Sequence, residues 1–79
     1  MSIHHLKTWP EYWIAIRDRK KNFEVRKNDR NFRVGDILKL REYDPIGEEY
    51  TGRVLNRQIT YILDHPEFCK DGYVILSIE

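Results

Sequence analysis

A lysine, a glutamate and an arginine lie close together in a part of the chain that is rich in basic residues. Lys21 and Arg26 offer two cations for a phosphate or a carbonyl group, and Glu24 offers one carboxylate that accepts a hydrogen bond from an amino group. The three side chains therefore have the chemistry of a clamp for a nucleotide-like ligand. The plainer interpretation is a Glu24–Arg26 pair on one face of a strand that only neutralises itself.

The spacing of these residues sets a condition on the backbone. Lys21 and Glu24 are three residues apart and would face opposite ways on one strand, because side chains alternate along a strand. All three groups converge only if Lys21 lies in a turn before the strand that carries Glu24 and Arg26. We therefore predict a helix, a turn at Lys21 and then a strand.

Charge is distributed unevenly along the chain. The net charge is +1, whereas residues 17–33 contain eight basic and three acidic residues and carry a local charge of +5. One interpretation is a positive face for phosphates, and the other is a solvated basic loop.

Aromatic side chains are candidate stacking surfaces for bases. The candidates are Trp9, Trp13, Tyr43 and Tyr50. Most aromatic residues in so small a domain belong to the core, so we expect Trp13 to be buried and Trp9 or Tyr50 to be available for stacking.

Length and composition predict one globular domain over residues 1–79, with 41% hydrophobic and 13% aromatic residues. The single cysteine, Cys69, cannot form an internal disulfide, which fits a reducing compartment. The longest apolar runs, Trp13–Ile16 and Tyr73–Leu76, are far too short to cross a bilayer. The first residues also lack a secretory signal pattern, so we expect a cytoplasmic monomer.

The strongest local signal predicts a helix that begins near Thr8. Thr8 and Glu11 have the spacing of a capping box, and Pro10 suits the first helical turn. Trp9, Tyr12, Trp13 and Ile16 then form one apolar stripe at helical spacing.

Alternation predicts the strands. Phe23 and Val25 alternate with Glu24 and Arg26, which indicates a strand whose apolar face is buried. Further strands are predicted at Ile3–Lys7, Ile37–Tyr43, Val54–Leu63 and Tyr73–Ile78, the last apolar enough to be covered on both faces. The fold class is therefore α+β: a small, closed or nearly closed β-barrel of about five strands, with one N-terminal helix packed against it.

The run Arg19–Arg26 resembles the Gly-x-Lys-x-x-Glu-x-Arg signature of the ASCH domain, a relative of the PUA RNA-binding fold. Lys21, Glu24 and Arg26 match its Lys, Glu and Arg, and Arg19 stands where the signature has glycine. A glycine suits a left-handed residue that closes a helix. Arg19 must therefore adopt a costlier conformation, or the helix must end differently.

The resemblance extends to a prophage-associated subfamily of unknown function, through His4–Lys7, Glu24–Arg30 and Val34–Asp36. It implies a PUA-like barrel that binds RNA or a nucleotide-like ligand. The candidate ligand-binding residues are Lys7, Lys21, Glu24, Arg26 and Arg30. No cofactor is expected, and no metal site, because the histidines and Cys69 match no established zinc spacing.

Two other functions stay open. Some ASCH relatives are hydrolases of modified nucleosides or ribonucleases, which would make Lys21 a base and Glu24 its partner. In the nucleoside hydrolases a threonine stands where this chain has Glu24, so the same covalent mechanism is not expected. The other alternative is a phage accessory protein that binds a protein partner of the host.

Overall fold

The computed structural model describes residues 1–79 and contains one helix and a five-stranded mixed sheet. The elements are, in chain order, β1 (Ile3–Thr8), α1 (Pro10–Arg17), β2 (Phe23–Lys27), β3 (Ile37–Asp44), β4 (Glu49–Leu63) and β5 (Tyr73–Ile78). The predicted α+β class, single helix and strand number are confirmed. β4 begins at Glu49 and not at the predicted Val54, so this strand starts five residues earlier than predicted. With α1 as its one helix, the chain has no apolar helix of membrane-spanning length.

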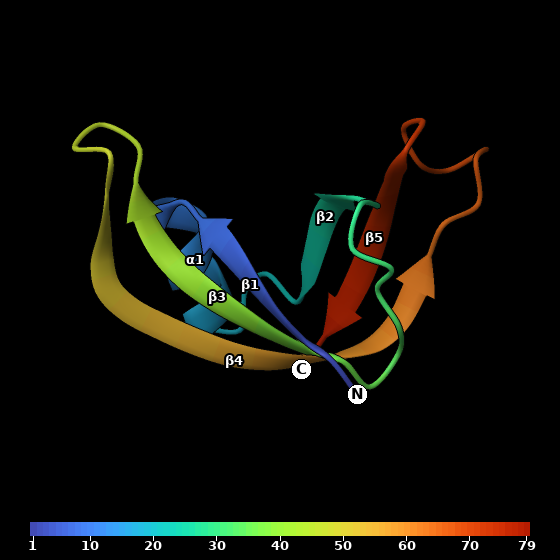
Figure 1. Ribbon diagram of the computed structural model, residues 1–79, viewed down its shortest axis with the longest axis horizontal. Coiled ribbons are helices and arrows are strands. Elements are labelled where there is room, and N and C mark those ends of the chain that lie inside the picture. The colour runs from blue at the N-terminus through green and yellow to red at the C-terminus, as the bar shows by residue number, and fades with distance from the viewer.

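The sheet is open. Its strands lie in the order β1-β3-β4-β5-β2, with β1 parallel to β3 and all other pairs antiparallel. β1 and β2 are the two end strands and do not pair with each other, so the predicted closure into a barrel is not confirmed. In Figure 1 the sheet is bent into a trough, with β1 and β3 on one side and β2 and β5 on the other.

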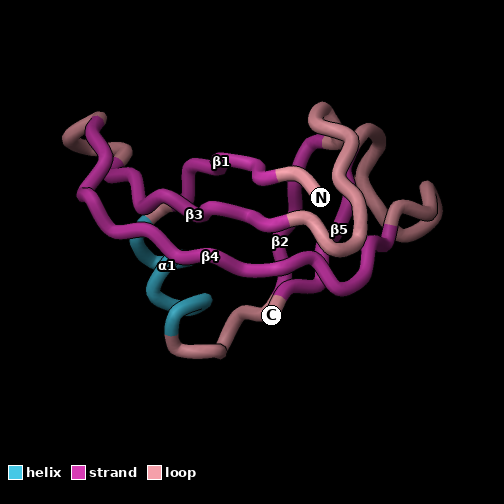
Figure 2. The backbone as a smooth tube through the Cα atoms, turned by 60° about the horizontal axis from the view of Figure 1, so that its bottom comes forward, coloured by secondary structure: helices cyan, strands magenta, loops and turns pink.

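β4 runs through both halves of the trough, as Figures 1 and 2 show. Its first part pairs with β3 and its end pairs with β5. A register shift between Ile59 and Tyr61 lies where β4 begins to pair with β5, and such an irregularity lets a strand bend. The apolar core fills the concave face and consists of Leu6, Trp13, Ile16, Phe32, Leu38, Leu40, Ile59, Val74, Leu76 and Ile78.

The start of α1 differs from the prediction. Trp9 is the N-cap residue and no side chain caps the helix, although Pro10 does occupy the first turn. Thr8 is instead the last residue of β1, where it is buried and pairs with Glu42 of β3. The predicted capping box is therefore wrong, because strand pairing takes the residue that would have formed it.

Arg19 ends the helix in a left-handed conformation, with φ at 62°. The Lys20 N–H donates to the Ala15 carbonyl at 2.9 Å, and the Arg19 N–H donates to the Ile16 carbonyl at 3.1 Å. These two bonds form the Schellman motif, which normally uses glycine at this position. Of the two alternatives for Arg19, the structure has the costlier conformation, and the turn that follows leads to Lys21.

β2 faces the opposite way from the prediction. Phe23 and Val25 are 45% and 52% exposed, whereas Glu24 is buried. Glu24 pairs with Leu76 of β5, and residues directly opposite each other share one face of a sheet. The charged face of β2 therefore points into the trough. β5 lies between β4 and β2, but one of its faces is buried and the other only half-buried, so full cover on both faces is not confirmed.

Replacing Arg19 by glycine is expected to stabilise the fold by about 1 kcal/mol, because glycine adopts a positive φ without the steric cost of a Cβ atom. For a domain of this size the melting temperature should rise by about 4–8 °C. The matched control is Lys20→Gly, where φ is not positive and glycine should lower stability. Urea and thermal unfolding measure both, and a melting temperature for R19G at or below wild type would contradict the expectation.

Candidate functional site

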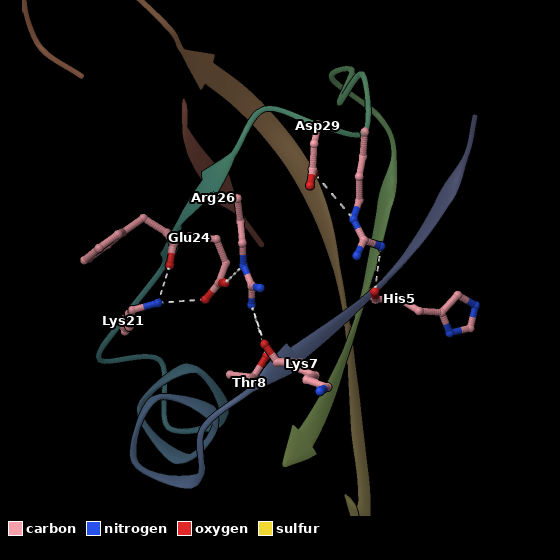
Figure 3. Close-up of polar contacts among 9 residues, drawn as sticks. His5, Lys7, Thr8, Lys21, Glu24, Arg26 and Asp29 are labelled. Carbon is pink, nitrogen blue, oxygen red and sulfur yellow. Dashed lines mark hydrogen bonds and ion pairs between the residues drawn. The ribbon is translucent and has the colours of Figure 1, made fainter. Parts of the chain in front are cut away.

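Lys21, Glu24 and Arg26 point toward one another where α1 leads into β2 (Figure 3). Lys21 Nζ lies 2.7 Å from Glu24 Oε1, and Arg26 Nε lies 2.8 Å from Glu24 Oε2. Lys21 lies in the turn before β2, as the spacing requires. The predicted convergence of the three groups is therefore confirmed.

Glu24 is only 3% exposed, and each of its oxygens accepts a hydrogen bond from a different cation. The cluster therefore has one positive charge more than its carboxylate neutralises. Lys21 Nζ also donates to the Phe23 carbonyl at 2.8 Å, which leaves one of its three N–H groups for a ligand. Both oxygens of Glu24 already accept hydrogen bonds from Lys21 and Arg26. The cluster therefore offers a ligand mainly hydrogen-bond donors.

Arg26 continues from this cluster to the opposite edge of the trough. Its Nη2 donates to the Lys7 carbonyl at 2.7 Å and lies 3.5 Å from Thr8 Oγ1 (Figure 3). Arg30 donates in the same way from Nη1 to the His5 carbonyl, at 2.9 Å. Two guanidinium groups thus connect the segment that begins with β2 to β1, where no backbone pairing exists.

A cavity of about 340 Å³ opens beside the cluster. It is lined by Lys7, Thr8, Trp9, Tyr12, Lys21, Glu24, Val25 and Arg26. Trp9 and Tyr12 are stacked, with ring centroids 6.4 Å apart and planes at 22°, and they are 51% and 45% exposed. The cavity therefore combines an aromatic wall with a cationic cluster.

The remaining candidates have different positions. Lys7 lines the cavity, but its Nζ lies 4.3 Å from the centroid of the Tyr43 ring. Arg30 does not line the cavity, and its role as a ligand-binding residue stays a prediction. Trp13 is buried as expected, and Tyr50 packs on Tyr43 and not in the cavity. Tyr12 was not among the candidates predicted from the sequence, although its spacing of three from Trp9 on a helix indicates that the two rings share a face.

Glu42 is a second buried carboxylate that the sequence analysis did not identify. Arg53 donates to both of its oxygens, at 2.9 and 2.8 Å, and the Thr51 hydroxyl donates to one of them. The hydrogen bond from Arg53 lowers the pKa of Glu42 despite its burial. Glu42 has the same strand parity as Leu38 and Leu40, so alternation along β3 could have placed it inside.

Asp36 is the third. It accepts hydrogen bonds from the backbone N–H groups of Ser2 and Arg33, both at 3.0 Å, and lies 2.8 Å from His4 Nε2. The hydrogen bond from Ser2, followed by that with His4, lowers the pKa of Asp36 to about 2. The chain contains no cluster of three or more His, Cys, Asp or Glu side chains that could bind a metal ion.

Comparison with known proteins gives one family and one relative. Residues 3–78 match the model of a domain of unknown function, DUF3850. The chain is also similar to the "Uncharacterized 12.9 kDa protein in GpA 3'region" of Escherichia phage P2, with 36% identity over 74 residues. This match covers 94% of the chain and 65% of the phage protein, so the chain spans less than two thirds of that relative.

Replacing Glu24 by glutamine is expected to lower the free energy of unfolding by about 2–3 kcal/mol, because Lys21 and Arg26 lose a charged hydrogen-bond acceptor. The control is Asp29→Asn, which breaks a wider, exposed ion pair with Arg30 and should cost about 0–1 kcal/mol. Urea unfolding at neutral pH compares the two, and equal losses would show that the buried carboxylate has no special importance.

Asp36 is expected to make stability depend on acid. Its folded pKa of about 2 lies below the ordinary value of 3.8, so its contribution is complete above about pH 5 and is lost as pH falls toward 2. The difference in unfolding free energy between wild type and Asp36→Asn should therefore shrink between pH 5 and pH 2. A constant difference over this range, measured by urea unfolding, would contradict the assigned role.

Proposed function

This chain belongs to the DUF3850 family of unknown function and is similar to a phage protein, and we propose that the chain binds RNA or a nucleotide-like ligand in the cavity beside Lys21. The observation that carries the proposal is the stacked pair of Trp9 and Tyr12 in a cavity that three cationic side chains also line. Exposed aromatic rings stack on unpaired bases, and ammonium and guanidinium groups bind phosphate and carbonyl oxygens.

The size of the cavity suits one nucleotide. Its volume of about 340 Å³ lies at the lower end of the range for small-molecule sites, about 300–1,000 Å³. A base stacks on the ring of Trp9, and a phosphate or keto oxygen accepts a hydrogen bond from the free N–H of Lys21. Arg26 keeps Glu24 neutralised and connects β2 to β1, so its main contribution is to the shape of the cavity.

Kinship with the ASCH and PUA-like domains is part of the same proposal. It is supported by the convergence of Lys21, Glu24 and Arg26, which match the ASCH signature, and by the left-handed conformation of Arg19 where that signature has glycine. A reducing cytoplasm as the location is also part of the proposal, and the free thiol of Cys69 fits it.

Titration with ribonucleoside monophosphates at low salt tests the proposal, followed by calorimetry for every variant and also by tryptophan fluorescence for the proteins that keep Trp9. Binding should change the emission of Trp9, and Trp9→Ala should weaken it by about 1–3 kcal/mol, the usual contribution of one stacked base. Lys21→Ala should weaken binding by about tenfold and reduce its dependence on salt, because one contact to an anion is lost.

The matched control is Lys20→Ala, which removes an exposed lysine of the same turn that does not line the cavity. Urea unfolding of each variant shows whether it is folded. The proposal fails if no nucleotide binds, or if all three variants bind as wild type does. Chromatography of the same mixtures with RNA and N4-acylated cytidines reports turnover, and turnover that Lys21→Ala abolishes would make the site catalytic.

A further inference from the structure

A second surface of the protein is basic and uncovered. It is the convex face of β1, β3 and β4, on the opposite side of these strands from the core and from α1, whose Trp13 Nε1 donates to the Leu40 carbonyl. Figure 2 shows the three strands side by side. We call this surface the outer face, and its charged and aromatic residues are His5, Lys7, Lys39, Arg41, Tyr43 and Tyr50.

The strand register brings the cations of the outer face together. Lys7 of β1 lies beside Arg41 of β3, and His5 lies beside Lys39. The outward positions of these strands contain no acidic residue. A row of like charges with no counter-charge is electrostatically costly, so it attracts anions from solution.

These cations also differ from those on the concave face in their bonding. The side chains of Lys7, Lys39 and Arg41 make no hydrogen bond or ion pair with any other part of the chain, whereas Lys21, Arg26 and Arg53 are all paired with a glutamate. These three concave cations neutralise buried carboxylates. The outer cations have no such partner, and their N–H groups are available to a ligand.

Two tyrosines lie among these cations. The rings of Tyr43 and Tyr50 meet edge to face, with centroids 5.1 Å apart. Lys7 Nζ lies 4.3 Å from the Tyr43 centroid, and the Arg41 guanidinium lies 4.0 Å from that of Tyr50. Alternating cations and aromatic rings are typical of surfaces that bind single-stranded nucleic acid, where phosphates meet the charges and bases stack on the rings.

We propose that a single strand of nucleic acid leaves the cavity near Lys7 and continues across the outer face, so that the ligand is an oligonucleotide and not a free mononucleotide. Lys7 joins the two surfaces, because it lines the cavity while its ammonium group lies over Tyr43. The proposal rests on the proposed function, since the cavity takes one nucleotide of the strand. Charge complementarity selects this occupant: a polyanion with planar bases fits a face that combines unpaired cations and tyrosine rings.

The test compares a ribonucleoside monophosphate with RNA and DNA strands of about eight nucleotides, within the range of about 4–16 that is typical of such surfaces. The variant is Lys39→Gln combined with Arg41→Gln, and the control with the same change of charge is Lys20→Gln combined with Lys70→Gln. The RNA or DNA strand should bind wild type at least about tenfold more tightly than the monophosphate. The ratio of the two strand affinities tells RNA from DNA.

The outer-face variant should lose about tenfold in affinity for the strand and keep its affinity for the monophosphate. Its plot of log affinity against log salt should become shallower by about 1.4, since each contact to a single strand contributes about 0.7. The control variant should lose less affinity for the strand than the outer-face variant does, and its salt dependence should change less. Urea unfolding shows that both variants are folded.

Two outcomes separate this proposal from the proposed function. Equal affinity for strand and monophosphate, or equal losses in the variant and the control, would overturn the outer-face proposal and leave the cavity as a nucleotide site. Strand binding that depends on Lys39 and Arg41 but not on Lys21 or Trp9 would support the outer face and overturn the assignment of the cavity.

Discussion

The carboxylate of Glu24 must be neutralised, because it lies on the concave face of the sheet, on the same side as the apolar side chains of β5. An isolated charge in such a place would destabilise the fold by several kcal/mol. Lys21 neutralises it from the turn after α1, and Arg26 does so from β2 itself. Arg26 then reaches β1, so one buried charge fixes the positions of three segments. The cavity lies where these three segments meet.

The two faces of the sheet use their cations differently. On the concave face each buried acid has its own partners, and no buried side-chain nitrogen or oxygen lacks a hydrogen bond. Arg53 pairs with Glu42 and also lies over the Trp13 ring, 4.3 Å from its centroid, which ties β3, β4 and α1 together. On the outer face Lys7 and Arg41 lie over tyrosine rings and have no acidic partner. The net charge of +1 therefore gives no indication of how much unpaired positive charge one face carries.

The sequence predicts local features well, because short-range rules determine them. The three-residue spacing of Lys21 and Glu24 requires a turn, and the structure has that turn. Alternation along residues 23–27 correctly predicts a strand but does not say which face is inside. The rule that apolar residues are buried failed for Phe23 and Val25, because Arg26 and the turn supply partners for Glu24. The position of Thr8 in β1 and the open form of the sheet depend on pairing between strands that are distant in the sequence. No local sequence pattern indicates such pairing.

The bonds from Arg26 and Arg30 to the carbonyls of β1 also affect how the protein behaves among its own copies. A strand at the end of a sheet exposes unpaired backbone groups, and another chain can add to it and start a fibril. Here guanidinium groups occupy the carbonyls of His5 and Lys7, and the charge beside them repels an identical edge. The side chains that connect the two ends of the open sheet therefore also cover carbonyl groups that another chain would need in order to pair with β1.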